Sequence, residues 1–256
     1  MASISQPIPL TRSIVVRQVR PDQPWQWLAS GWRDLASTPV VSLGYGSGLV
    51  LVSYLLVLGL WQADLPYLVL PLAGGFFLLA PLIAVGLYDT SRRLQAGEPT
   101  GLVIAVTAWR RPMQVATFGV VLLLLHFAWT RIALLWFALY FHGEVPPLEA
   151  IPFYLIDAEN LPFLVIGAML GAGFAALVFA VSAISLPMLL DRDIDVVSAM
   201  LCSLRTVRKN PKAMALWAGL IVLFTAIGLA TFFVGLGLLF PLVAHATWHA
   251  YKDLVG

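Results

Sequence analysis

The strongest constraint on this chain is its last apolar block, which runs from Ala213 to Tyr251 without one Asp, Glu, Lys or Arg. A continuous helix over those 39 residues would be about 58 Å long, roughly twice the thickness of a bilayer's hydrocarbon core. We therefore expect the block to fold back near residues 231–237, where Gly235 and Gly237 lie, and to form two spans. A short or re-entrant second segment is the alternative.

The remaining sequence is equally unsuited to water. The chain is 60% hydrophobic and only 11% charged, whereas a soluble domain carries about a quarter of charged residues. We expect an all-α membrane protein, a bundle of about six transmembrane helices. Its single integral membrane domain covers residues 25–256 and follows a cytoplasmic tail at 1–24. The predicted spans are about 40–62, 66–88, 113–141, 161–190, 213–231 and 234–251. No short apolar core with a cleavage site follows the first arginines, so we expect the first run to remain as a span.

The charges indicate an orientation. In the arrangement of six spans, 14 of the 15 Lys and Arg residues lie in segments on one side of the membrane. The charged residues of the loops on the opposite side are all Asp or Glu. Because cytoplasmic loops are enriched in Lys and Arg, we place both termini in the cytoplasm of a bacterial inner membrane. Arg131 is the one base inside a span.

Amphipathic stretches begin at residues 25, 102 and 196, each before an odd-numbered span. Their helical spacing indicates helices that lie in the membrane interface. A proline ends each stretch, and a further proline lies inside each even-numbered span, at Pro81, Pro187 and Pro241. Residues 75–84 also match residues 235–244 at six of ten positions. These features predict a threefold repeat of helix hairpins. The alternative is a chance match between apolar segments of limited alphabet.

Several motifs resemble one known family. They are Gly31-Trp32-Arg33-Asp34, the segment Pro81–Tyr88 with Ser91-Arg92-Arg93 and Gly97-Glu98-Pro99, the segment Ser185–Asp195, Asn210-Pro211 and His245-Ala-Thr-Trp-His249. Together they resemble the bacterial integral membrane family called domain of unknown function number 2189, from about residue 20 to 255. The resemblance implies a membrane protein without an established activity.

Some members of that family carry the label cytochrome c oxidase subunit I. That catalytic subunit binds two haems and a copper ion, which require more histidines than the four present here. The chain is therefore not that subunit, although an accessory role beside an oxidase stays open.

Two groups of polar residues are candidate sites. Asp191, Asp193 and Asp195 alternate in a cytoplasmic turn, but Val196 and Cys202 replace the glycine and glutamate of a calcium loop. We expect a solvated turn in which Asp195 caps a helix; weak divalent-ion binding or a partner contact is the alternative.

His245 and His249 are four residues apart and share a helix face. We expect hydrogen bonds at the membrane interface, with Trp248 and Tyr251 as an aromatic anchor. A metal or haem site completed by His126 is the alternative.

Arg131 is the most informative single residue. A charge within a span is costly, so the guanidinium must snorkel, pair or line water. Its distance from Met113 is about 27 Å along a helix, which favours snorkelling toward acids such as Glu144 or Asp64. A role in the passage of an anion or substrate is the alternative.

The sequence contains no motif of a hydrolase, a phosphate-binding loop or a metalloprotease, so we predict neither a catalytic residue nor a cofactor. Our leading hypothesis is a non-enzymatic accessory, assembly or scaffold component, for example beside a respiratory complex. The alternative is a small-solute transporter or channel. The expected partners are the lipid bilayer and other membrane protein subunits, and not nucleic acid.

The charge pattern predicts a topology that reporter fusions can test. Reporters fused after Gln62, Glu149 and Gly235 should be active in the periplasm, and those fused after Gly97, Ser203 and Gly256 in the cytoplasm. A cytoplasmic signal at Glu149 would contradict the orientation that the positive charges indicate.

Overall fold

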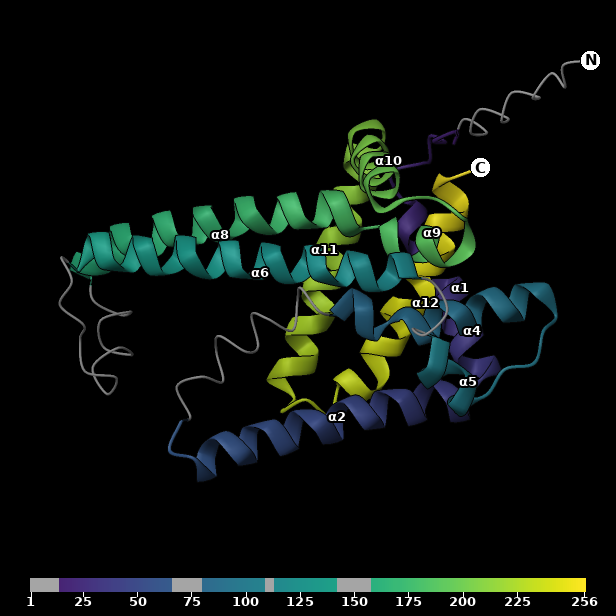
Figure 1. Ribbon diagram of the computed structural model, residues 1–256, viewed down its shortest axis with the longest axis horizontal. Helices are drawn as coiled ribbons and strands as arrows, with labels where there is room; N and C mark the ends of the chain where they lie inside the picture. The colour runs from purple at the N-terminus through teal and green to yellow at the C-terminus, as the bar shows by residue number, and fades with distance from the viewer. Residues whose placement is uncertain (1–13, 66–79, 109–112, 142–157) are drawn as a thin grey trace, which may run out of the picture.

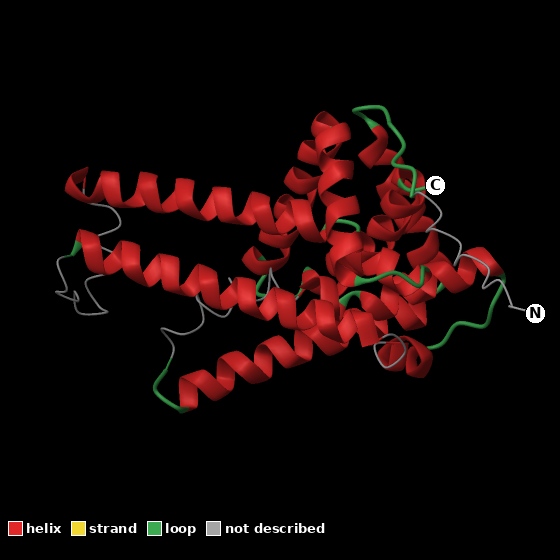
Figure 2. Cartoon of the chain, turned by 45° about the horizontal axis from the view of Figure 1, so that its top comes forward, coloured by secondary structure: helices red, strands yellow, loops and turns green. Residues whose placement is uncertain are grey.

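The structure, a computed structural model, describes residues 14–65, 80–108, 113–141 and 158–256. In these ranges the regular structure is helical, apart from one isolated β-bridge between Val16 and Val255 (Figures 1 and 2). The expected all-α class is therefore confirmed for this part of the chain. The helices are α1 (Gln23–Ser37), α2 (Pro39–Gln62), α4 (Val85–Ala96), α5 (Leu102–Thr107), α6 (Met113–Tyr140), the 3-10 turn η3 (Ala158–Asn160), α8 (Leu161–Ser182), α9 (Ser185–Asp191), α10 (Val196–Lys209), α11 (Pro211–Ala230) and α12 (Leu236–Leu254).

Four of the described segments are long and apolar enough to cross a membrane. They are Pro39–Gln62, Met113–Tyr140, Leu161–Asp191 and Pro211–Ala230. Most of the predicted second span lies outside the described residues. The predicted sixth span coincides with α12, which is not among the four because its second half carries His245, His249, Lys252 and Asp253. The six-helix bundle stays a prediction.

The three prolines of the predicted repeat lie in different local structures. In the first hairpin the helix breaks at Ala84, three residues after Pro81, and α4 begins at the next residue. In the second hairpin the break lies at residues 183–184, between α8 and α9, and therefore before Pro187. Pro241 lies inside the unbroken helix α12. The threefold repeat therefore also stays a prediction.

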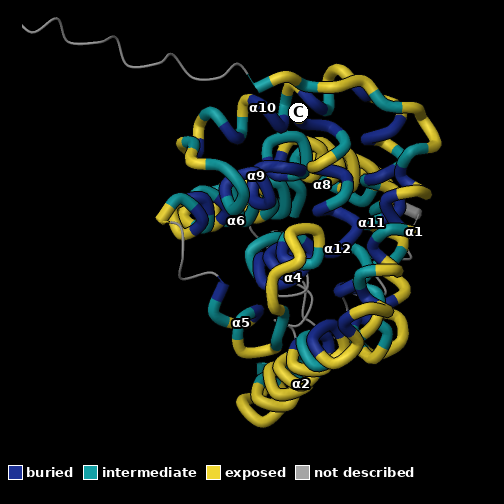
Figure 3. The backbone as a smooth tube through the Cα atoms, turned by 90° about the vertical axis from the view of Figure 1, so that its right-hand side faces the viewer, coloured by how far each residue is buried: buried dark blue, intermediate teal, exposed yellow. Residues whose placement is uncertain are grey.

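Helix α12 is the centre of the molecule. It packs against α1, α2, α4, α9 and α11, and Figure 3 shows buried residues concentrated around α12, α4 and α9, while α2 is exposed along most of its length. Trp248 and Tyr251 of α12 are 1% and 0% exposed. The expectation that they form an aromatic anchor among the headgroups is wrong, because neighbouring helices enclose them.

Two glycines allow this close packing. A Cβ atom on Gly46 of α2 would lie 2.0 Å from the carbonyl oxygen of Gly237 in α12. On Gly31 of α1 it would lie 2.6 Å from the backbone nitrogen of Ala246. Backbone contact at these distances is possible only without a side chain, so both helices depend on glycine where they cross α12.

Substitution at Gly46 should test this dependence. Gly46→Ala inserts a methyl group into backbone and should lower the stability by about 1–3 kcal/mol, measured as a lower Tm in detergent. Gly48→Ala is the matched control on the same helix, since no atom lies within 4 Å of its Cβ position, and its Tm should be unchanged or slightly raised. Equal Tm values for the two variants would contradict the close approach of α2 and α12.

Candidate functional site

The predicted histidines lie in a hydrogen-bonded network between α1, α2, α4 and α12. Nε2 of His245 is 2.9 Å from Oγ of Ser42, and its Nδ1 is 2.7 Å from Oγ of Ser91. The Ser91 hydroxyl donates to Oδ2 of Asp34 at 2.6 Å. His245, Ser42 and Ser91 are all 0% exposed, so this inner branch of the network has no contact with solvent.

An outer branch ends at the same carboxylate oxygen. Nε2 of His249 is 2.8 Å from Oδ2 of Asp34, and Nδ1 of His249 is 3.4 Å from Nε2 of Gln95. The indole of Trp248 donates to Oε1 of Gln95 at 3.0 Å. Asp34 therefore accepts hydrogen bonds that begin on two other helices.

Donor chemistry fixes the direction of the outer branch. An indole N–H can only donate, so Gln95 must present its oxygen to Trp248 and its amide group to His249. Nδ1 of His249 is then an acceptor, and Nε2 carries the proton that bonds Asp34. The hydrogen bonds consequently run from Trp248 through Gln95 and His249 to Asp34.

The inner branch runs the same way. The Ser91 hydroxyl proton bonds Asp34, so its oxygen accepts from Nδ1–H of His245. Nε2 of His245 then lacks a proton and accepts from the Ser42 hydroxyl. Both rings are neutral in this pattern, and one carboxylate provides the negative end of both branches.

The hydrogen bonds hold Asp34 in its charged form. Burial alone would raise the pKa of its carboxyl group, but the hydrogen bonds from His249 and Ser91 outweigh burial and lower the pKa below its ordinary value. A serine, a histidine and an aspartate so connected resemble a nucleophile with its base, yet Ser42 is closed to any substrate. The network therefore joins helices.

The three aspartates of the acidic turn do not act together. Asp191 accepts from the Tyr251 hydroxyl at 2.7 Å and from Nζ of Lys252 at 3.2 Å, and so ties α9 to α12. Asp195 accepts from the backbone N–H of Ser198 at 2.9 Å, which confirms the predicted cap of α10. The side chain of Asp193 is exposed. In the described ranges no three such side chains converge to hold a metal ion.

Arg131 is exposed on the distal half of α6. No ion pair within the described residues includes it. Of its two predicted partners, Glu144 lies outside them and Asp64 forms no ion pair with it. The choice between snorkelling, pairing and a role in passage therefore stays open.

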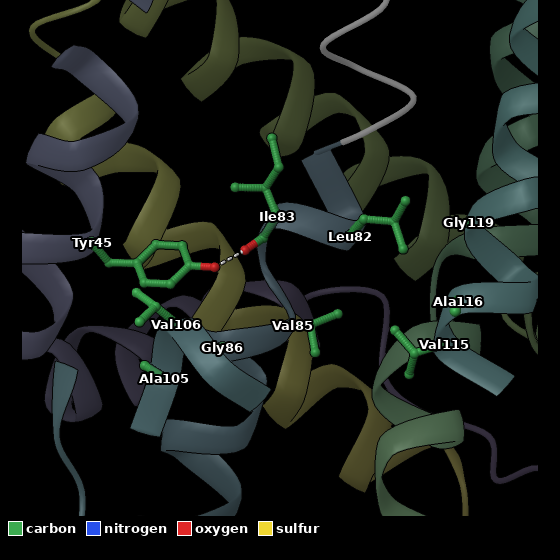
Figure 4. A pocket seen from close by; sticks show the side chains of 10 residues that line it. All are labelled: Tyr45, Leu82, Ile83, Val85, Gly86, Ala105, Val106, Val115, Ala116 and Gly119. Carbon is green, nitrogen blue, oxygen red and sulfur yellow. Dashed lines mark hydrogen bonds between the residues drawn. The ribbon is translucent and has the colours of Figure 1, made fainter. Parts of the chain in front are cut away.

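An apolar pocket of about 470 Å³ lies beside the helix break at Ala84 (Figure 4). Residues from α2, α4, α5 and α6, with the helical residues Leu82 and Ile83 before the break, form its walls. Because the break leaves the Ile83 carbonyl without a helical partner, this oxygen accepts a hydrogen bond from Tyr45 instead. The pocket offers hydrocarbon and one satisfied hydroxyl, which suits an apolar occupant.

Sequence reasoning missed Asp34, Ser42, Ser91 and Gln95. Asp34 and Ser91 do lie in two of the motifs that carry the family resemblance, which was the available signal. Nothing local to Ser42 or Gln95 indicated their role, because their partners are 203 and about 150 residues away.

Asp34 should dominate the stability of this junction. Asp34→Ala leaves two donors without their acceptor and should cost about 1.5–3 kcal/mol. Asp34→Asn should cost less, since both bonds end on one oxygen that an amide can supply. Asp193→Ala is the control, because an exposed carboxylate should change stability by less than about 0.5 kcal/mol. Thermal unfolding in detergent would measure all three; equal losses at Asp34 and Asp193 would contradict the junction.

The lowered pKa of Asp34 also predicts that the stability of the protein depends on pH in the acidic range. A group whose pKa is lowered by folding stabilises the protein above its ordinary pKa, and this stabilisation is lost as the pH falls through the lower folded value. The wild-type Tm should therefore decrease below about pH 4 in part because Asp34 becomes protonated. Asp34→Asn should show a smaller decrease over that range, and an identical decrease would contradict the assignment.

Comparison with known proteins agrees with this architecture. No curated protein and no solved structure matches the chain. The model of a family of predicted integral membrane proteins matches residues 69–191, a region that includes α4, α6 and α8. Over these residues the chain is similar to the family of predicted integral membrane proteins known as domain of unknown function number 2189.

Proposed function

We propose that this protein is a non-enzymatic accessory or scaffold subunit of the bacterial inner membrane, and that α8 packs against a transmembrane helix of another subunit. The observation that carries the proposal is the exposed face of α8. Only 6% of the apolar window in Leu161–Asp191 is buried, so nearly all of this span is available to lipid or to a partner.

One stripe of the exposed surface of α8 consists of small residues, beside exposed large residues such as Met169 and Leu170. Ala168, Ala172 and Ala176 recur every fourth residue and are exposed, and a Cβ on Gly173 would meet no atom within 4 Å. Small residues at this spacing let two helices approach closely in a membrane, where packing rather than the hydrophobic effect drives association. Lipid contact alone does not require them.

An adjacent side of α8, about 100° around the helix, already shows such packing inside the chain. The Cβ positions of Gly167 and Gly171 lie 3.3 Å from the indoles of Trp136 and Trp129 of α6. Trp136 also donates to the Phe163 carbonyl at 3.2 Å. One glycine face of α8 thus receives large side chains from α6, and the alanine face is available for a second helix.

The arrangement of helix ends supports the proposed topology of six spans with both termini in the cytoplasm. The start of α2, the start of α6 and the end of α8 lie near α4, α9 and α12, and these three spans extend away from them in one direction (Figure 1). Those ends are the ones next to the positively charged segments. We infer a compact cytoplasmic part that holds apolar spans in place for partners such as the subunits of a respiratory complex.

Site-specific photocrosslinking tests the proposed partner contact. A crosslinker at position 172 of the full chain should capture one membrane protein in native membranes, identified by mass spectrometry after extraction in mild detergent. The double variant Ala168→Leu with Ala176→Leu fills the face and should reduce capture at least tenfold, about 1.4 kcal/mol.

Leu177→Phe is the control, since it adds bulk to α8 at an exposed residue that lies outside the alanine face. It should leave capture unchanged. Capture of lipid alone at position 172, or equal capture by the double variant, would contradict the scaffold function.

A transporter is the second candidate, and the pocket beside Ala84 favours it. Broken helices that line a cavity are typical of transporter binding sites. This function predicts a protein that is stable without partners and loses uptake in proteoliposomes when Ala116→Phe fills the pocket.

A further inference from the structure

We propose that the corner between α10 and α11 binds the phosphate headgroups of anionic phospholipids. Four exposed bases, which we call the basic corner, lie there within eight residues: Arg205, Arg208, Lys209 and Lys212. The proposal does not depend on the scaffold function, because it concerns lipid and not a protein partner.

The basic corner is not neutralised within the described chain. Three bases elsewhere pair with buried or half-buried acids: Arg92 and Arg93 with Asp89, and Lys252 with Asp191. No ion pair of the described residues includes a member of the basic corner. Like charges three and four residues apart on a helix repel each other, so an external anion would relieve the repulsion.

The dipole of α10 does not account for the whole cluster. Arg208 and Lys209 lie in its last turn, where cations are favourable. Lys212 lies in the first turn of α11, where a cation is unfavourable and the free N–H groups attract anions. The end of one helix and the start of the next therefore both present positive charge at one place.

The corner is rigid because Asn210 fastens it to the N-terminal segment. Its Oδ1 accepts from the backbone N–H of Val19 at 2.9 Å, and its Nδ2 donates to the Arg17 carbonyl at 3.0 Å. Nζ of Lys209 also donates to the Val16 carbonyl at 2.7 Å. The backbone N–H of Arg17 donates in turn to the Leu254 carbonyl at 2.8 Å. Both ends of the described chain therefore hold the corner.

The apolar surface of α10 points to lipid as the occupant. Val197 and Leu201 are 64% and 48% exposed, and they share the outer face of the helix with Arg208. The buried residues Ala199, Cys202 and Thr206 form the opposite face. A helix with exposed hydrocarbon followed by bases is typical of the membrane interface, and α11 enters the apolar region directly behind it. Figure 1 shows α10 on the outside of the molecule, next to α8 and α11.

Lipid retention from nanodiscs tests the proposal. The full chain is placed in nanodiscs with equal amounts of phosphatidylglycerol and phosphatidylcholine, and the lipids that remain after transfer to mild detergent are counted by mass spectrometry. One base near an anionic surface contributes about a fivefold preference, so the wild type should retain phosphatidylglycerol at least fivefold over phosphatidylcholine. High salt should reduce this preference.

The decisive variant combines Arg205→Gln, Arg208→Gln and Lys212→Gln. Lys209 is kept because its ammonium group also holds the Val16 carbonyl. The preference should fall at least fivefold, while Arg205→Lys, Arg208→Lys and Lys212→Arg in combination should keep it. Arg20→Gln with Arg33→Gln removes exposed bases elsewhere and should also keep it.

Three results would overturn the proposal: a wild type without preference, a wild-type preference in the glutamine variant, or an equal loss when Arg20 and Arg33 are neutralised. Should the glutamine variant fail to fold, Arg208→Gln alone decides, since it should reduce the preference severalfold. An unchanged preference in that single variant would also overturn the proposal.

Discussion

One carboxylate oxygen joins the helices around α12. Oδ2 of Asp34 accepts hydrogen bonds from Ser91 on α4 and from His249 on α12, and His245 extends the connection to α2. A buried polar group is costly unless it is bonded, so any arrangement that separates these helices leaves several donors without partners. The crossings at Gly31 and Gly46 depend on the same alignment.

The two halves of α12 reflect two solvents. Its first half, beginning at Leu236, is apolar, and its second half carries the polar side chains of the network and ends near Lys252 and Asp253. The helix therefore lies across the boundary between the apolar spans and the polar part of the molecule. Its central position follows, because only a helix with both kinds of surface can pack against α2 and against α4.

Much of this fold could be predicted from the sequence, since lipid imposes long apolar runs and the interface imposes amphipathic ones. The helix starts at Pro39 and Pro211 and the cap at Asp195 are local signals of the same kind. The spacing of His245 and His249 also predicted that they share a face. Their partners could not be predicted, because hydrogen bonds between residues 154–215 positions apart leave no periodic pattern.

The helix break at Ala84 shows where local rules stop. A proline in a helix frees the carbonyl four residues before it, so Pro81 does not account for the free carbonyl at Ile83. Here the hydroxyl of Tyr45, which belongs to another helix, bonds the Ile83 carbonyl. The carbonyl would otherwise need water at the edge of an apolar pocket, where water is scarce. The break is therefore stabilised by tertiary contact, and a sequence that loses Tyr45 would favour a continuous helix through residue 84, which would move α4 and its Ser91 away from Asp34.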